Sequence, residues 1–140
     1  MKSIIIDDEP DAVEALHFTL MEVCPEVAVA GKYTDPVKGL AAIREHKPDL
    51  VFLDIEMPVL NGFQLLEEFG DVSFALIFTT AYDRFAVKAF RFSAVDYLLK
   101  PINPDELRRA VDKVAEKQRI EKAQIDLLRQ QLYTPTDARR

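Results

Sequence analysis

The sequence predicts an α/β protein with a doubly wound, five-stranded parallel sheet in the order 2-1-3-4-5 and an extended C-terminal helix. Apolar strand-like runs alternate with segments of helical periodicity five times, and the connections between them are short. Residues 50–53 show no polar alternation, which is typical of a strand covered on both faces of a parallel sheet. The chain of 140 residues is about one domain long.

The five predicted strands are short apolar runs that end at polar or turn-forming residues. They cover residues 3–6, 27–30, 50–53, 74–78 and 94–99. The first run is β-branched and stops at an acidic pair, the second is closed by Gly31, and the third is followed by Asp54. The fourth run ends in Thr79 and Thr80, and the fifth ends at Lys100 before a proline.

Helices are predicted between these strands by proline starts and by apolar residues at helical spacing. Pro10, with an acidic cap before it, begins the first helix, and Pro25 ends it. Asp35 before Pro36 begins the second helix, and a turn at residues 61–62 leads into the third. The apolar residues at these spacings are Ala12, Leu16, Leu20 and Val23, then Leu40 and Ile43, then Phe63, Leu65, Leu66 and Phe69, and then Phe85, Val87, Ala89 and Phe90.

The last predicted helix is longer than a domain of this size needs. It starts near residues 103–105 and meets no breaker before Pro135, so a continuous helix from Asp105 to Leu132 would extend roughly 42 Å. Its apolar spacing alternates between four and three residues through Leu107, Val111, Val114, Gln118, Glu121, Ile125, Leu128 and Leu132, a heptad seam with two polar interruptions. The first half should pack on the sheet and the second half should protrude. The protruding half is either a solvated tail or a helical linker to a further domain or a dimer partner.

The composition limits the classes of function. A formal net charge of -6 disfavours direct nucleic-acid binding by this segment. Cys24 is the one cysteine and lies in an apolar stretch, so we expect a buried thiol and no internal disulfide. His17 and His46 lie far apart without a metal-ligand pattern. No apolar run matches a secretory signal or a membrane span, so a cytoplasmic protein without a membrane partner is expected.

Polar residues follow four of the predicted strands. Asp7 and Asp8 follow the first strand, Asp54 the third, Thr80 the fourth and Lys100 the fifth. Strands one and three flank the switch point of a doubly wound sheet, so these side chains should gather at one sheet edge. Each residue alone has a simpler explanation, such as helix capping by Asp7 and Asp8, but the set as a whole favours a common site.

This predicted cluster fits phosphoryl transfer. The carboxylates repel one another, and a hard divalent cation such as Mg²⁺ would compensate them through oxygen ligands. A lysine adds a positive charge, and a threonine hydroxyl can donate to a phosphoryl oxygen. A carboxylate can itself accept the phosphoryl group, and catalysis then consists mainly of positioning and charge neutralisation.

Four motifs surround these residues. They are IIIDDE at residues 4–9, FLDIEMP at residues 52–58 with Asn61-Gly62, Thr80-Ala81, and DYLLKP at residues 96–101. Together they resemble the receiver domains of two-component response regulators over residues 1–120. Residues 78–90 and 95–102 are similar more narrowly to the LytR/AlgR class, whose members usually carry a LytTR DNA-binding domain after the receiver.

The resemblance implies the roles of the acidic residues. Asp54 would accept a phosphoryl group from the phosphohistidine of a sensor histidine kinase, and would also face the metal ion. Asp8 would ligate Mg²⁺, Asp7 would act nearby through water, and Glu56 would contribute its backbone carbonyl. The protein would then be a signalling switch, not an enzyme, although it would assist its own phosphorylation and dephosphorylation.

The resemblance also implies how the switch works. Lys100 would bridge to the phosphoryl group, and the bond from Lys100 to Pro101 would be cis. Thr80 would move towards the phosphoryl group, and Tyr97 would rotate inwards in the active state. The surface of the fourth helix, the fifth strand and the last helix would then be reshaped, and this surface is the expected homodimer contact.

The resemblance leads to an expected division of the chain. We expect a receiver domain at residues 1–120, a helical extension at 121–133 and a flexible tail at 134–140. The output domain for transcription regulation, and with it any DNA contact, would be missing from this chain; a stand-alone receiver is the alternative. An aspartyl-phosphate hydrolase is a rival that lacks a second downstream acidic motif and room for a substrate cap. An interaction module that ignores phosphate is another rival.

Two further positions bear on the lifetime of the phosphorylated state. Glu56 lies two residues after Asp54, and Tyr82 lies two residues after Thr80. In receivers these positions flank the path of the hydrolysing water. We therefore predict that the bulky side chain of Tyr82 shields the aspartyl phosphate and slows self-dephosphorylation.

Overall fold

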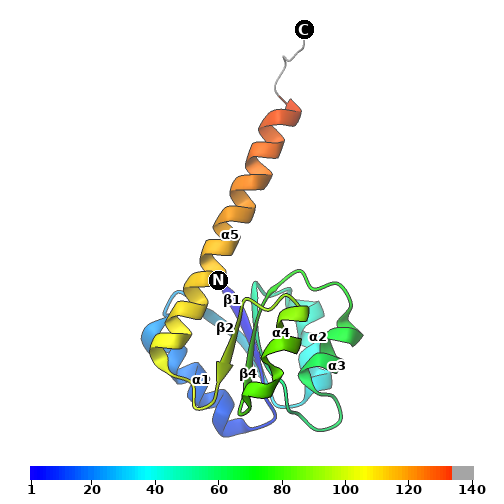
Figure 1. Ribbon diagram of the computed structural model, residues 1–140, viewed down its shortest axis with the longest axis vertical. Helices are drawn as coiled ribbons and strands as arrows, with labels where there is room; N and C mark the ends of the chain where they lie inside the picture. The colour runs from blue at the N-terminus through cyan, green and yellow to red at the C-terminus, as the bar shows by residue number, and fades with distance from the viewer. Residues whose placement is uncertain (134–140) are drawn as a thin grey trace.

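The computed structural model describes residues 1–133, which form a three-layer α/β domain with one helix extending from it (Figure 1). The strands are β1 (Lys2–Ile6), β2 (Ala28–Tyr33), β3 (Leu50–Asp54), β4 (Ala75–Thr80) and β5 (Asp96–Leu99). They form one parallel sheet in the order β2-β1-β3-β4-β5. The predicted fold class and strand order are confirmed.

Helices cover both faces of the sheet. α1 (Pro10–Val23) and the long α5 (Pro104–Tyr133) pack on one face. α2 (Pro36–His46), α3 (Gly62–Phe69) and α4 (Ala86–Arg91) pack on the other, and the 3₁₀ turn η1 (Asp83–Phe85) precedes α4. Each face of the sheet therefore has its own apolar core.

The central strands supply both cores. Ile4 and Ile6 of β1 face α2 and α3, whereas Ile5 faces α1 and α5, and all three are essentially inaccessible to solvent. All five residues of β3 are buried. The unalternating apolar pattern of this strand thus reflects a central position between two helical layers. Cys24 is buried in the α1–α5 core, as expected for a packing thiol.

The start of α1 differs from the prediction. Pro10 occupies the first helical turn as expected, but Glu9, the N-cap, makes no side-chain capping bond. Instead, its backbone N–H donates to the Asp7 carboxylate at 3.0 Å. The inner face of the helix also begins at Val13, where Ala12 was predicted.

β2 extends further than predicted. A strand closed by Gly31 was expected at residues 27–30, but β2 continues through Gly31 to Tyr33. The pairing of β2 with β1 shifts register between Ser3 and Ile4. A Cβ at Gly31 would lie 2.6 Å from the Tyr33 ring, so this glycine makes room for the ring within the strand.

The segment before β5 is also less regular than predicted. The expected helix through residues 85–90 is split into η1 and the six-residue α4, and β5 starts at Asp96 although a start at residue 94 was predicted. Ala89 is buried, whereas Val87 and Phe90 are 71% and 64% exposed. These apolar residues therefore form a surface, which helical periodicity alone does not distinguish from a core face.

α5 divides into a packed half and a protruding half. Leu107, Val111 and Val114 are fully buried against the sheet, whereas Ile125 and Leu132 of the same seam are exposed. Figure 1 shows this second half rising away from the domain. Within residues 1–133, none of the helices is both long and apolar enough to cross a membrane. The tail predicted at 134–140 lies outside the described residues.

Candidate functional site

Parallel register brings the predicted polar residues to one edge of the sheet. Ile6 of β1 pairs with Leu53 of β3, so Asp7 and Asp54 follow side by side. Thr80 of β4 pairs with Leu99 of β5, and the Lys100 N–H donates to the Thr80 carbonyl at 2.7 Å. The carboxyl ends of four strands thus meet at the switch point, as the sequence predicts.

Three carboxyl groups lie together at this edge. Asp7, Asp8 and Asp54 each offer a carboxylate oxygen, and these oxygens all lie within 4.8 Å of one another. Asp7 and Asp54 are only 4% and 3% exposed, and Asp8 is half-buried. A compact set of oxygen donors with excess negative charge fits a hard divalent cation such as Mg²⁺.

Lys100 supplies positive charge to the cluster. Its Nζ lies 2.7 Å from Asp7 Oδ2, 3.6 Å from Asp54 Oδ1 and 3.7 Å from Glu9 Oε1. Burial lowers the pKa of Lys100, but the hydrogen bond to Asp7 and the neighbouring carboxylates outweigh it and raise that pKa overall. The lysine therefore stays protonated. Its bond to Pro101 is cis, as predicted.

The surroundings of Asp54 disfavour its charged form. Burial, together with the negative charges of Asp7 and Asp8, raises the pKa of Asp54 to about 8, although Lys100 opposes this shift. A phosphoryl acceptor must be the carboxylate, because the protonated acid is a poor nucleophile. One lysine therefore does not fully compensate the cluster, which is the electrostatic reason for expecting a cation there.

Thr80 and Tyr97 are connected through the backbone of Tyr82. The Thr80 side chain is buried, and its Oγ1 accepts a hydrogen bond from the Tyr82 N–H at 3.2 Å. The Tyr97 hydroxyl donates to the Tyr82 carbonyl. Burial raises the pKa of the half-buried Tyr97 phenol, which keeps it a donor. Both side chains are thus bonded to the backbone of one residue, Tyr82.

Glu56 lies at the rim of the site. Its carboxylate forms an ion pair with Arg84 at 3.0 Å. Metal coordination by its backbone carbonyl stays a prediction. Together with the acidic cluster this rim encloses a hollow of about 180 Å³, which is lined by Asp8, Glu9, Asp54, Glu56, Ala81, Tyr82 and Lys100.

Sequence reasoning interpreted Gly62 only as part of a turn. A Cβ on this residue would lie 2.5 Å from the backbone carbonyl oxygen of Asp54, so only glycine lets α3 begin this close to the acceptor. Asn61 and Gln64 form a reciprocal capping box at the same helix start. The capping pattern was a signal for the helix start, but no local pattern revealed the close approach to Asp54.

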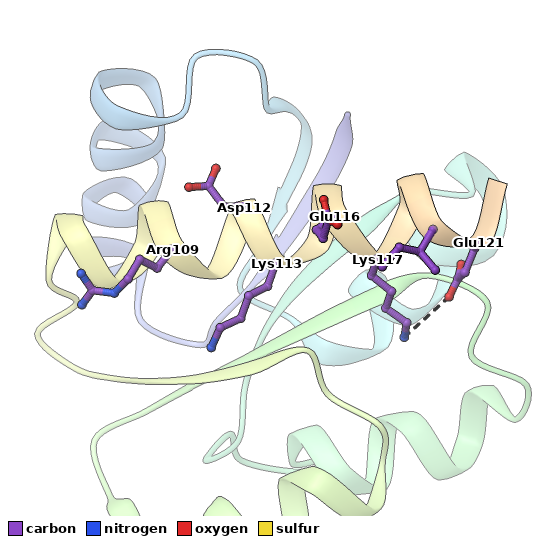
Figure 2. A pocket seen from close by; sticks show the side chains of 7 residues that line it. Arg109, Asp112, Lys113, Glu116, Lys117 and Glu121 are labelled. Atoms are coloured by element: carbon purple, nitrogen blue, oxygen red, sulfur yellow. Dashed lines mark ion pairs between the residues drawn. The ribbon is translucent and has the colours of Figure 1, made fainter. Parts of the chain in front are cut away.

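A larger hollow lies away from the acidic cluster. It measures about 660 Å³ and runs along α5, where it is lined by residues that include Lys113, Lys117 and Ile120. Figure 2 shows Lys113 and Lys117 projecting from the same side of the helix, with Lys117 paired to Glu121. Its lining comes from α5 alone and includes none of the residues of the acidic cluster.

The fold and the site define a doubly wound α/β domain with an acidic, lysine-containing centre at the switch point of its sheet. A family profile described as "Response regulator receiver domain" matches residues 4–112, and the chain belongs to this family. The family assignment rests on most of the domain and agrees with the site geometry.

Curated relatives include response regulators of known and unknown role. The chain is 42% identical over 116 residues to an uncharacterized response regulatory protein of Vibrio vulnificus, covering 82% of this chain and 48% of that protein. It is 37% identical over 112 residues to the transcriptional regulatory protein BtsR of Escherichia coli K12, covering 79% and 46%. It is 36% identical over 117 residues to the sensory transduction protein LytT of Enterococcus faecalis, covering 82% and 48%. The chain thus spans about half the length of the curated relatives it matches.

Solved receiver domains share the fold. The response regulatory domain of mrkE from Klebsiella pneumoniae superposes with a TM-score of 0.75 at 29% identity, covering 84% of this chain and 97% of that one. The REC domain of AraT from Geobacillus stearothermophilus gives a TM-score of 0.73 at 32% identity, covering 86% and 97%.

Proposed function

We propose that this chain is a Mg²⁺-dependent phosphorylation switch in which Asp54 accepts a phosphoryl group from the phosphohistidine of a sensor histidine kinase. One observation carries the proposal. The Asp54 carboxylate is buried beside Asp7 and Asp8, and its Oδ1 lies 3.6 Å from Lys100 Nζ. This arrangement offers a nucleophile, a cation site and a fixed positive charge in one hollow.

The residues divide the work of transfer. An Asp54 oxygen forms the bond to phosphorus while the bond from phosphorus to the kinase histidine breaks, and Lys100 stabilises the phosphoryl oxygens. Asp8 and Asp54 would hold Mg²⁺, with Asp7 through water and the Glu56 carbonyl as a further ligand. The bound cation would neutralise charge on the transferring oxygens and so lower the barrier.

Phosphorylation would be transmitted through Thr80 and Tyr97. A phosphoryl oxygen is a strong acceptor for the Thr80 hydroxyl, which now accepts from Tyr82. A shift of Thr80 would move the Tyr82 backbone and with it the hydrogen bond from Tyr97. The charge added at Asp54 would in this way reshape the surface formed by α4, β5 and α5.

The α4–β5–α5 face is the proposed homodimer contact. Val87 and Phe90 of α4 and Leu99 of β5 are exposed there. Lys113 of α5 forms an ion pair with Asp96 of β5 at 2.9 Å, and the hollow along α5 adds charges of both signs (Figure 2). Apolar anchors within a rim of mixed charge suit a two-fold contact between identical surfaces.

The output of the switch is proposed to be transcription regulation through a LytTR domain outside this chain. The similarity to LytT and BtsR, of which this chain spans about half, supports that proposal. The protruding half of α5 would then serve as the linker to the output domain. The chain itself would act as a signalling switch and would touch DNA only through that domain.

Phosphorylation by a small donor tests the proposed function. The chain is incubated with acetyl phosphate, with and without Mg²⁺, and its intact mass is measured. We expect a gain of one phosphoryl group that requires Mg²⁺ and is lost in Asp54→Asn. The absence of any gain would overturn the proposal, and repeated turnover of a small phosphoester would favour the hydrolase.

A further inference from the structure

Arg84 of η1 links the two sides of the hollow that contains Asp54. Its Nη2 lies 3.0 Å from Glu56 Oε1, on the connection that follows β3. Its guanidinium carbon lies 4.3 Å from the centroid of the Tyr82 ring, on the connection that follows β4. The same group lies 4.8 Å from the centroid of the Phe85 ring. One side chain therefore joins two loops that come from different strands.

The residues that Arg84 joins both line the hollow. Glu56 and Tyr82 form part of its wall together with Asp54 and Lys100. The backbone of Tyr82 is already held, because its N–H donates to Thr80 and its carbonyl accepts from Tyr97. Tyr82 is 43% exposed, and its ring contacts Arg84 and Phe85.

We propose that Arg84 is a positioning residue that sets the lifetime of the aspartyl phosphate, by holding Tyr82 and Glu56 together across the mouth of the hollow. The inference rests on the proposed function of Asp54 and extends it. It assigns control of water access to Arg84, whose side chain contacts Glu56, Tyr82 and Phe85.

The step that Arg84 controls is hydrolysis of the phosphorylated Asp54. The oxygen of a water molecule forms a bond to phosphorus, and the bond from phosphorus to the Asp54 oxygen breaks. The electron pair of the broken bond returns to Asp54 as the carboxylate, and the water protons leave with the phosphate. The attacking water must approach in line, opposite the Asp54 oxygen, and therefore from the open side of the hollow.

Arg84 affects this approach in two ways. Its guanidinium lies over the Tyr82 ring, and this cation–π contact would keep the ring at the mouth. Its ion pair occupies the Glu56 carboxylate at the rim of the hollow, which would otherwise be free to accept a proton from an incoming water. A lysine would retain the charge for the ion pair but would lack the broad guanidinium that lies over the ring, so Arg84→Lys weakens the second effect less than the first.

The lifetime of the phosphorylated chain tests the proposal. The chain is phosphorylated with acetyl phosphate and Mg²⁺, the donor is removed, and loss of the phosphoryl group is followed by intact mass. We expect Arg84→Ala to shorten the lifetime about fivefold. An exposed cation–π contact and an exposed ion pair are each weak, so each holds Tyr82 or Glu56 in place only modestly. Arg84→Lys should lie between Arg84→Ala and the wild type.

Arg44 provides a matched control. It is also an exposed arginine over an aromatic ring, 5.5 Å from the Phe69 centroid, and it donates to the Glu68 carbonyl away from the site. Arg44→Ala should leave the lifetime unchanged. Thermal unfolding of both alanine variants separates an altered lifetime from a loss of folding.

A double-mutant cycle identifies the route. Tyr82→Ala should shorten the lifetime, and adding Arg84→Ala should then have a smaller effect than it has in the wild type, because only the ion pair with Glu56 is left to lose. Equal lifetimes of the wild type and Arg84→Ala, or effects of the two substitutions that multiply independently, would overturn the inference while leaving Asp54 as the acceptor. If the wild type took up no phosphoryl group at all, the proposed function itself would fail.

Discussion

The surroundings of Asp54 disfavour the charged form of its carboxyl group. It is buried beside Asp7 and Asp8, and Lys100 Nζ lies closer to Asp7, at 2.7 Å, than to Asp54, at 3.6 Å. A strongly shifted pKa in a hollow of this kind is typical of functional sites. The free energy of unfolding of the metal-free chain should therefore depend on pH.

The raised pKa of Asp54 gives this dependence a direction. The folded-state pKa, about 8, lies above the ordinary value of 3.8, so the folded chain binds more protons than the unfolded chain between these values. In metal-free solution the free energy of unfolding should thus fall as the pH rises from about 4 to about 8. Urea unfolding at several pH values measures this slope, which Asp54→Asn should reduce. Equal slopes for the two proteins would contradict the electrostatic account.

The position of Asp54 also depends on Gly62. Gly62→Ala places a methyl group 2.5 Å from the Asp54 carbonyl oxygen, a backbone atom that cannot rotate away. We expect phosphorylation by acetyl phosphate to slow about tenfold or more, since misplacing a reacting group by about 1 Å can cost up to about a hundredfold. Gly31→Ala is the control, because the atoms it would meet are at the end of the Tyr33 side chain. Equal rates for both variants would remove Gly62 from the site.

Among the elements, α5 has two different tasks. Its first half completes the core on the α1 side, and Arg108 fixes it to the end of α1. Arg108 Nη1 donates to the Val23 carbonyl at 2.7 Å, and the guanidinium also pairs with Glu26 and Asp112. The second half of α5 is exposed throughout residues 121–132.

The anchor at Arg108 predicts a stability effect. Arg108→Ala should lower the free energy of unfolding by about 1–2 kcal/mol, because a partly buried carbonyl loses its donor. Arg119→Ala removes only an exposed pair with Glu116 and should lower the free energy of unfolding much less than Arg108→Ala does. Chemical denaturation of both variants provides the comparison. A cost for Arg119→Ala as large as that for Arg108→Ala would argue against the anchor.

Truncation tests the division between receiver and extension. A chain that ends at Ile120 loses residues that bury nothing in the described structure, so its midpoint of thermal unfolding should be close to that of the longer chain. Circular dichroism should show a loss of helix without a loss of cooperativity. A marked drop in the unfolding midpoint would place the domain boundary beyond residue 120.

The ends of the strands could be predicted from the sequence, whereas contacts between separate loops could not. Strand ends were predictable because apolar runs stop at Asp7, Asp54 and Lys100, and parallel connectivity then brings these ends together. The ion pair of Arg84 with Glu56 and the close approach of Gly62 to the Asp54 carbonyl were not predictable, because both depend on the distance between separate loops. The exposure of Val87 and Phe90 on α4 was also not predicted, since helical spacing does not indicate which apolar face is covered.

For the whole molecule, the account predicts a dimer that forms on activation. With beryllofluoride and Mg²⁺, which together mimic the phosphorylated state, the chain should increase in size by light scattering or sedimentation. Phe90→Asp on α4 should prevent the increase without affecting phosphorylation. Phe18→Asp is the control, because Phe18 is similarly exposed, at 63%, but lies on α1. Equal effects of the two variants would exclude the α4–β5–α5 face.

Chemical mapping shows whether Asp54 carries the phosphoryl group. The chain is phosphorylated with acetyl phosphate and Mg²⁺, reduced with borohydride, which converts an aspartyl phosphate to homoserine, and digested for peptide mass analysis. We predict homoserine at position 54 and unmodified carboxylates at Asp7 and Asp8. Reduction at either of those positions, or none at position 54, would contradict this prediction.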